Sequence, residues 1–153
     1  MLSKIEDFEG KTIKLHSNIT MNQGQNASDF SAVAPSESWT PIGDRYFQFK
    51  GTFDGQGHSI AGLYARGYNT KLALFTNTKG SCLVKNTKLT NSYLESRGFG
   101  GVAGFASGGG GKFERLYSDA TLNVVGAYSG YAGGICSKMS LTANINECWF
   151  DGL

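Results

Sequence analysis

The amino-acid sequence predicts an all-β fold, a parallel β-helix (β-solenoid) with a short N-terminal capping helix. Glycine supplies 22 of the 153 residues, about twice its usual share of roughly 7%, while proline supplies only 2. Similar segments recur about every 30 residues in the second half of the chain, a period typical of solenoids, propellers and helical arrays. No repeat contains a helical face of ten residues or more, which excludes helical arrays and leaves a β-solenoid.

One domain is expected over 1–153, and its first element is a helical cap over 1–10. Ser3 and Glu6 have the spacing of a capping box, and Gly10 can end the helix. The apolar side of this helix would consist of Leu2, Ile5 and Phe8.

Strands are predicted from residue 12 onward, where apolar and polar residues alternate over 12–15 and 18–21. A long loop excursion follows over 22–45, because this segment is polar, contains both prolines and has no sustained period. We expect it to be ordered and packed by Trp39. The candidate anchors are Phe30, Trp39 and Ile42.

The repeats cover residues 73–153. The segment 101–104 matches 134–137 at an offset of 33, and 113–119 matches 145–151 at an offset of 32, with a weaker copy upstream. We interpret the glycine pairs at 100–101 and 133–134 as equivalent corners of stacked coils, since sharp corners need positive φ or close backbone approach.

Composition excludes several classes of protein. No apolar run approaches the ~18 residues of a membrane helix, and the first residues do not resemble a signal peptide. A net charge of +2 without a nucleic-acid-binding motif does not favour DNA or RNA. Three cysteines without C-x-x-C spacing predict free thiols, not a disulfide framework or zinc site: Cys82, Cys136 and Cys148. We predict no cofactor and no metal. A bound Ca²⁺ ion is the alternative, although no residue pattern supports it.

Two motifs in the first half of the chain point to a known family. They are W-x-P-I-G at 39–43 and F-x-G-x-F-D-G-x-G-H-x-I at 49–60, and glycine-rich repeats follow them. This arrangement resembles the GLUG-repeat proteins, bacterial exported and surface proteins that include adhesin-like proteins and regions accompanying IgA-specific metallopeptidases. The resemblance implies a right-handed parallel β-helix in an extracellular or cell-surface setting, without one fixed activity. This sequence departs from the family pattern at 136–137, where Cys-Ser replaces the Ala-Gly of the preceding copy.

Asp54 and His58 lie close enough in sequence to act as an acid and a base. The segment favours a structural turn instead, in which Asp54 bonds its own backbone, Gly55 and Gly57 allow positive φ, and His58 bonds a turn carbonyl. Neither His58 nor His16 lies in an H-E-x-x-H motif, so no zinc-peptidase activity is expected.

Stacking the repeats predicts one outward-facing cluster. At an offset of 32, Tyr117 lies over Trp149 and Asp119 over Asp151, about 4.8 Å apart, with Lys88 on the preceding coil. Aromatic faces suit the apolar side of a sugar ring, and carboxylates accept hydrogen bonds from its hydroxyls. These five residues are therefore predicted to bind a glycan. The alternative is a stabilising aromatic ladder with two turn aspartates.

The sequence favours a non-catalytic adhesion or recognition module of a bacterial surface or secreted protein. The alternatives are a carbohydrate-active β-helix enzyme, either a polysaccharide lyase or a glycoside hydrolase, and a purely structural spacer. The expected partner is a host or bacterial glycan or a surface protein, without nucleic acid or membrane insertion. The repeat stops in mid-coil at 151–153, so we expect a fragment of a longer protein or end-to-end self-association through this edge.

Overall fold

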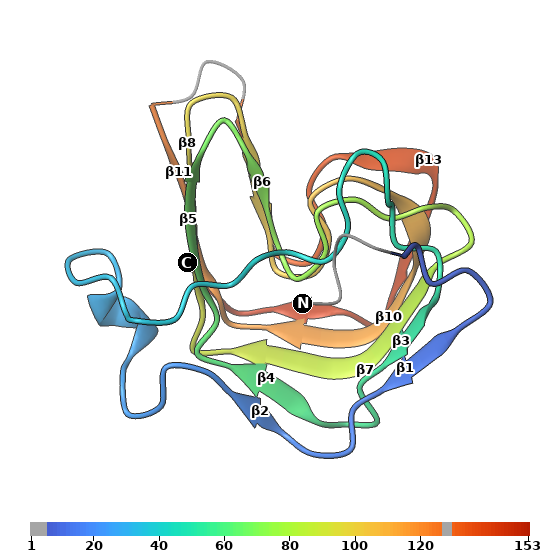
Figure 1. Cartoon of the computed structure of the whole chain (residues 1–153), viewed down its shortest axis with the longest axis horizontal. Helices are drawn as coiled ribbons and strands as arrows, with labels where there is room; N and C mark the ends of the chain where they lie inside the picture. Colours follow the sequence, from blue (N-terminus) through green and yellow to red (C-terminus); the bar gives the residue numbers. More distant parts are fainter. Residues whose placement is uncertain (1–5, 127–129) are drawn as a thin grey trace.

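The computed structural model describes residues 6–126 and 130–153 and shows parallel strands wound into a β-solenoid of about three turns (Figure 1). The helical structure in the described residues is one 3₁₀ turn, η1 (Ala27–Asp29). This part of the chain contains no helix that could span a membrane. The strands are β1 (Thr12–Lys14), β2 (Ile19–Thr20), β3 (Thr52–Asp54), β4 (Ser59–Ala61), β5 (Tyr64–Tyr68), β6 (Lys71–Leu72), β7 (Leu83–Thr90), β8 (Tyr93–Arg97), β9 (Gly101–Ala103), β10 (Gly109–Ser118), β11 (Thr121–Val125), β12 (Tyr131–Gly133), β13 (Met139–Asn146) and β14 (Trp149–Phe150).

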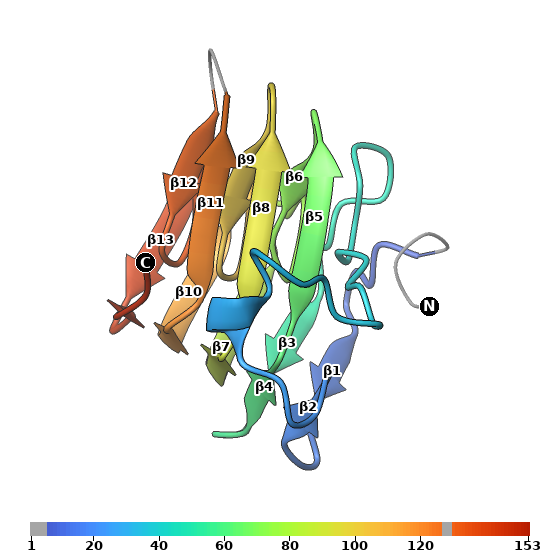
Figure 2. The ribbon, with the colours of Figure 1, turned by 90° about the vertical axis from the view of Figure 1, so that its left-hand side faces the viewer.

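The strands form three sheets, and all described pairs are parallel because each coil adds its strands in the same direction. The large sheet follows the path β1-β3-β7-β10-β13, with β2, β4 and β14 beside it. The two smaller sheets have the orders β5-β8-β11 and β6-β9-β12, and Figure 2 shows the second behind the first. The all-β solenoid predicted from the repeats is confirmed.

One repeat alignment predicted from the sequence is wrong. Gly101 pairs with Tyr131, which is an offset of 30, so 101–104 do not stack on 134–137 at an offset of 33. Gly101 and Gly133 lie inside β9 and β12, and they are therefore not equivalent corners.

A bulge in β13 changes the coil-to-coil offset after this segment. The offset between β10 and β13 is 30 at Gly109, which pairs with Met139, and it is 32 at Gly111, which pairs with Ala143. Three residues of β13 therefore face one residue of β10. The offset of 32 holds for 145–151 because that segment follows the bulge.

Phenylalanine rings fill the centre of the solenoid. The ring centroids of Phe49 and Phe75 are 4.6 Å apart, and those of Phe53 and Phe75 are 5.6 Å apart. Phe105 and Phe113 extend the core into later coils and are fully buried. Inward positions of neighbouring coils lie about one strand spacing apart, so large apolar side chains stack into one continuous core.

The helical cap predicted over 1–10 is absent from its described part. Residues 6–10 contain no helix, whereas Leu2, Ser3 and Ile5 lie outside the described residues. Phe8 has a φ of 60°, a left-handed conformation that an α-helix does not accommodate. Its ring instead packs on Phe49 with 5.8 Å between centroids. One aromatic side chain therefore covers this part of the core without a helix.

The excursion over 22–45 is packed on the solenoid. Its predicted anchors are all buried or half-buried: Phe30, Trp39 and Ile42. The Trp39 indole Nε1 donates a hydrogen bond to the carbonyl of Ala73 at 3.2 Å. Phe30 packs edge-on against Tyr64 with 5.6 Å between centroids. In Figure 2 the excursion crosses in front of β5 and β8, so it covers part of the outer face of that sheet.

Gly62 is predicted to tolerate no side chain, because a Cβ there would lie 1.9 Å from the carbonyl oxygen of Met21 on the preceding coil. Gly24 is the matched control, since both glycines have positive φ (+73° and +80°) but Gly24 has open space around it. Left-handed strain of about 1–2 kcal/mol is common to both alanine variants. We expect Gly62→Ala to lower the free energy of unfolding by about 2 kcal/mol more than Gly24→Ala, measured by urea denaturation. Equal losses would contradict close packing at Gly62.

Candidate functional site

The large sheet bends at three stacked residues with left-handed backbone conformations. Asn86 in β7, Arg115 in β10 and Glu147 after β13 have φ values of 55°, 51° and 52°. Their flanking residues pair, so they occupy the same position on successive coils. A groove of about 460 Å³ lies along this bend. Its lining comprises Gln56, Gly57, Asn86, Thr87, Lys88, Arg115, Leu116, Tyr117, Glu147 and Trp149.

Three of the five residues predicted to bind a glycan line this groove. Tyr117 on β10 pairs with Lys88 on β7 and with Trp149 on β14, so their side chains follow one another across the coils. Tyr117 is half-buried, whereas Lys88 and Trp149 are exposed, Trp149 by 67%. We name these three residues the groove ladder. A large exposed aromatic side chain in a groove is typical of a binding surface.

Asp119 and Asp151, the other two predicted residues, are not among the described residues that line the groove. The Asp119 carboxylate accepts a hydrogen bond from the backbone N–H of Asn91 at 2.8 Å, which is a turn contact. Asp151 is exposed. Burial raises the pKa of Tyr117, and the charges of Asp119 and Asp151 raise it further. The phenol therefore stays protonated at neutral pH and can donate a hydrogen bond.

The polar rim of the groove was missed by the sequence reasoning. Arg115 Nε donates to the Asn86 side-chain oxygen at 2.7 Å, and Arg115 Nη1 lies 3.7 Å from a Glu147 carboxylate oxygen. Arg115 Nη2 also lies 3.5 Å from Glu114. These contacts hold the guanidinium along the bend. The signal was available, because the three stacked rim residues recur at offsets of 29 and 32.

Asp54 anchors the loop that forms one wall of the groove. Its Oδ1 accepts hydrogen bonds from the Gln56 backbone N–H and the Asn86 side-chain amide, both at 3.0 Å, and its Oδ2 lies 3.4 Å from Lys85 Nζ. Burial alone would raise the pKa of Asp54, but these hydrogen bonds and the Lys85 charge outweigh it and lower the pKa. Asp54 is therefore a charged structural anchor.

The rest of this loop is a tight turn. The His58 backbone N–H donates to the Gly55 carbonyl at 2.8 Å. Positive φ occurs at Gln56 (52°) and Gly57 (+85°) but not at Gly55, so the prediction of positive φ at Gly55 is wrong. The His58 ring does not bond a turn carbonyl, because its Nδ1 lies 3.3 Å from the Asn18 side-chain oxygen. The structure thus gives Asp54 and His58 different partners.

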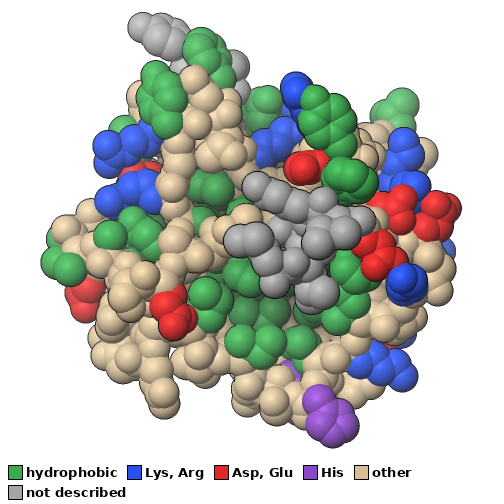
Figure 3. All heavy atoms as spheres, in the orientation of Figure 1, with side chains coloured by type: hydrophobic (Ala, Val, Ile, Leu, Met, Phe, Trp, Pro, Cys, Tyr) green, Lys and Arg blue, Asp and Glu red, His purple; other side chains and the backbone are tan. Residues whose placement is uncertain are grey.

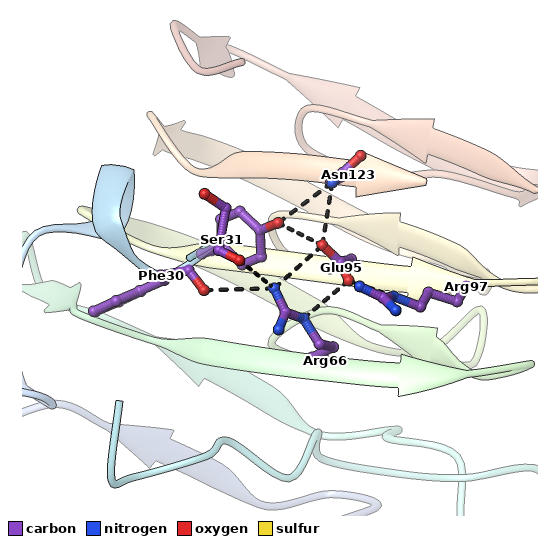
Figure 4. Close-up of polar contacts among 7 residues, drawn as sticks. Phe30, Ser31, Arg66, Glu95, Arg97 and Asn123 are labelled. Carbon is purple, nitrogen blue, oxygen red and sulfur yellow. Dashed lines mark hydrogen bonds and ion pairs between the residues drawn. The ribbon is translucent and has the colours of Figure 1, made fainter. Parts of the chain in front are cut away.

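A buried ionic cluster lies on the outer face of the β5-β8-β11 sheet (Figure 4). The Glu95 side chain is 4% exposed, and its Oε1 lies 2.7 Å from Arg97 Nε and 2.9 Å from Arg66 Nε. Its Oε2 accepts hydrogen bonds from Tyr93 Oη at 2.6 Å and from the Asn123 amide at 3.2 Å. We name these five residues the clasp.

Arg66 joins the clasp to the excursion. Its Nη2 donates to the backbone carbonyls of Ser31 at 3.1 Å and Phe30 at 3.5 Å. The guanidinium also lies 5.9 Å from the ring centroids of Tyr64 and Tyr93. The clasp therefore fastens the excursion to the sheet, and its charges are used in structural contacts.

Among the described residues, no group of three or more His, Cys, Asp or Glu side chains could hold a metal ion. The three cysteines are free thiols: Cys82, Cys136 and Cys148. Burial raises the pKa of Cys82 to about 11, so this thiol is a poor nucleophile at neutral pH.

Comparisons with protein-family models, curated protein sequences and solved structures found no match. The resemblance to the GLUG-repeat proteins therefore stays a prediction.

Glu95→Gln tests the clasp. Burial alone would raise the pKa of Glu95, but hydrogen bonds from Tyr93 and Arg97 and the charges of Arg66 and Arg97 outweigh it and lower the pKa. Such a carboxylate stabilises the fold above about pH 4.3, and this contribution is lost as the pH falls through the folded-state pKa. We expect a loss of roughly 2–3 kcal/mol of unfolding free energy at pH 7, below that of a fully buried pair because both arginines are partly exposed.

Glu147→Gln is the matched control, because its carboxylate side chain is 62% exposed and also faces an arginine. We expect it to change the unfolding free energy by less than about 0.5 kcal/mol. Urea denaturation at several pH values measures both variants, and the Glu95→Gln effect should shrink toward pH 3. Equal effects of the two variants, or a Glu95→Gln effect independent of pH, would count against the clasp.

Proposed function

We propose that this chain is a non-catalytic recognition module that binds a carbohydrate in the groove along the bend. The observation that carries the proposal is the groove ladder, in which Lys88, Tyr117 and Trp149 lie in register on three successive coils. A volume of about 460 Å³ is within the range of small-molecule sites, roughly 300–1,000 Å³.

The chemistry of the lining suits a sugar. Tyrosine and tryptophan combine a flat apolar face with a polar tip, and a sugar ring combines an apolar C–H face with a rim of hydroxyls. The rim side chains of Gln56, Asn86 and Arg115 carry donors and acceptors that match those hydroxyls. The Tyr117 hydroxyl adds a further donor, because a phenol is protonated at neutral pH.

The carboxylate that lines the groove is paired with an arginine, which favours binding without catalysis. Glycoside hydrolysis generally uses two carboxyl groups that flank the scissile bond. The described groove lining contributes Glu147, which lies 3.7 Å from Arg115 in an ion-pair arrangement. The enzyme alternative would require a second acid to converge on the same ligand. The spacer alternative would require that the ladder binds nothing.

We also propose that the module belongs to a bacterial exported or surface protein with an adhesin-like role, as the resemblance to the GLUG-repeat proteins implies. The proposed coil is right-handed. In support, the strands run clockwise in Figure 1, and the two views together place the N-terminal coil nearest the viewer.

Alanine variants of the groove ladder test the proposal. A glycan array of neutral and acidic oligosaccharides identifies a ligand, and isothermal titration then gives its affinity. We expect Tyr117→Ala and Trp149→Ala each to weaken binding roughly 10-fold, because each removes one aromatic face, equivalent to about 1.4 kcal/mol. The double variant should show no measurable binding.

Tyr68→Ala is the matched control, since Tyr68 is 73% exposed on β5 and lies outside the groove lining. We expect it to bind like the wild type. Unchanged affinity of the double variant would refute the groove as the binding site, and release of reducing ends from a bound oligosaccharide would establish the enzyme alternative.

A further inference from the structure

The C-terminal end of the solenoid exposes apolar side chains at interior positions. Ile145 stacks on Phe113 of the preceding coil, yet Ile145 is 50% exposed while Phe113 is fully buried. Other large apolar residues near this end are also exposed: Leu141, Phe150 and Leu153. An apolar patch of this kind marks an interaction surface.

The backbone at this end is open as well. In the part of the chain that the structure describes, β13 pairs with β10 on one side only. Natural edge strands are commonly protected by charged residues, proline or bulges. Met139–Asn146 contains no charged residue and no proline. Its bulge lies in the first half, so 143–146 form a regular, uncharged edge.

The N-terminal end has a different character. Lys50 Nζ lies 2.6 Å from Asp7 and 3.1 Å from Glu9, and Lys11 pairs with Glu6. Figure 3 looks onto this end and shows apolar side chains gathered at its centre and acidic and basic side chains on its right-hand rim. A head-to-tail contact would remove these charges from water against an apolar edge, which is unfavourable. The same edge of a second copy meets the C-terminal edge without burying these charges.

We propose that two copies of this chain associate through β13, antiparallel and related by a two-fold axis at Asn144. In this register, opposite residues lie on the same face of the joined sheet. Ile145 of each copy faces the small Ala143 of the other, and the two Asn144 amides, each both donor and acceptor, face one another. The contact is isologous and brings no like charges together. This inference is independent of carbohydrate binding.

Sedimentation velocity on the full chain tests the association. We expect a concentration-dependent dimer. Asn144→Lys should weaken dimerisation at least roughly 10-fold, because two lysines would meet on the axis. Thr12→Lys is the matched control, since Thr12 is also exposed and lies on β1 at the other end, and it should leave the dimer unchanged. Circular dichroism verifies that both variants are folded.

Cross-linking tests the register. On the axis, the two thiols of Asn144→Cys would lie within reach of a disulfide under copper-catalysed air oxidation. Asn146→Cys should not cross-link, because residue 146 faces residue 142 of the second copy. A strictly monomeric wild type up to about 1 mM would overturn the proposal. Open-ended polymers, or equal weakening by Asn144→Lys and Thr12→Lys, would also overturn it.

Discussion

The structure depends on the parallel hydrogen bonding between neighbouring coils. This bonding fixes each residue about one strand spacing from its counterpart on the next coil, so side chains form columns along the solenoid. Inward columns must stack tightly, and the Phe49–Phe75 contact at 4.6 Å is one result. Outward columns are equally ordered, although water surrounds them. The ordered outward columns form the candidate groove, which therefore follows from the same constraint as the core.

Much of this arrangement follows from the repeat in the sequence. After the bulge, each residue of the last coil lies 32 positions beyond its partner on β10, so Trp149 stacks on Tyr117. The alignment of 101–104 failed because it matched one glycine string to another, although Gly101 pairs with Tyr131. Glycine is a weak guide to register, since it marks corners, strands and close contacts alike. Bulky inward residues such as Phe113 are better guides, because each must occupy core space.

Other features could not be predicted from a periodic pattern. Phe8 covers the core from a left-handed residue, which depends on the position of Phe49 and not on local propensity. Arg66, Glu95 and Asn123 of the clasp occupy one column at the repeat offsets of 29 and 28, but the contact of Arg66 with the Phe30 carbonyl in the excursion follows no repeat. The Glu95 carboxylate is stable in this position because several donors converge on it. The rim of the groove was predictable in part. The spacing of Asn86, Arg115 and Glu147 is visible in the sequence, but the contacts between their side chains are not.

Two aromatic columns on this solenoid differ in what covers them. Tyr64 and Tyr93 stack at 6.1 Å with rings 18° apart and are nearly fully buried, because the excursion and Phe30 lie on them. Tyr117 and Trp149 have the same coil-to-coil relation, yet Trp149 stays 67% exposed. Covering such a side chain would contribute about 25 cal/mol per Å² of apolar surface buried. Stacking between coils accounts for the aromatic residues in both columns. Trp149 belongs to the last coil of the described residues, but the groove beside Tyr117 and Trp149 also has no covering loop. A ligand that fills this groove would give a reason for the open column, and this asymmetry favours recognition over a purely structural ladder.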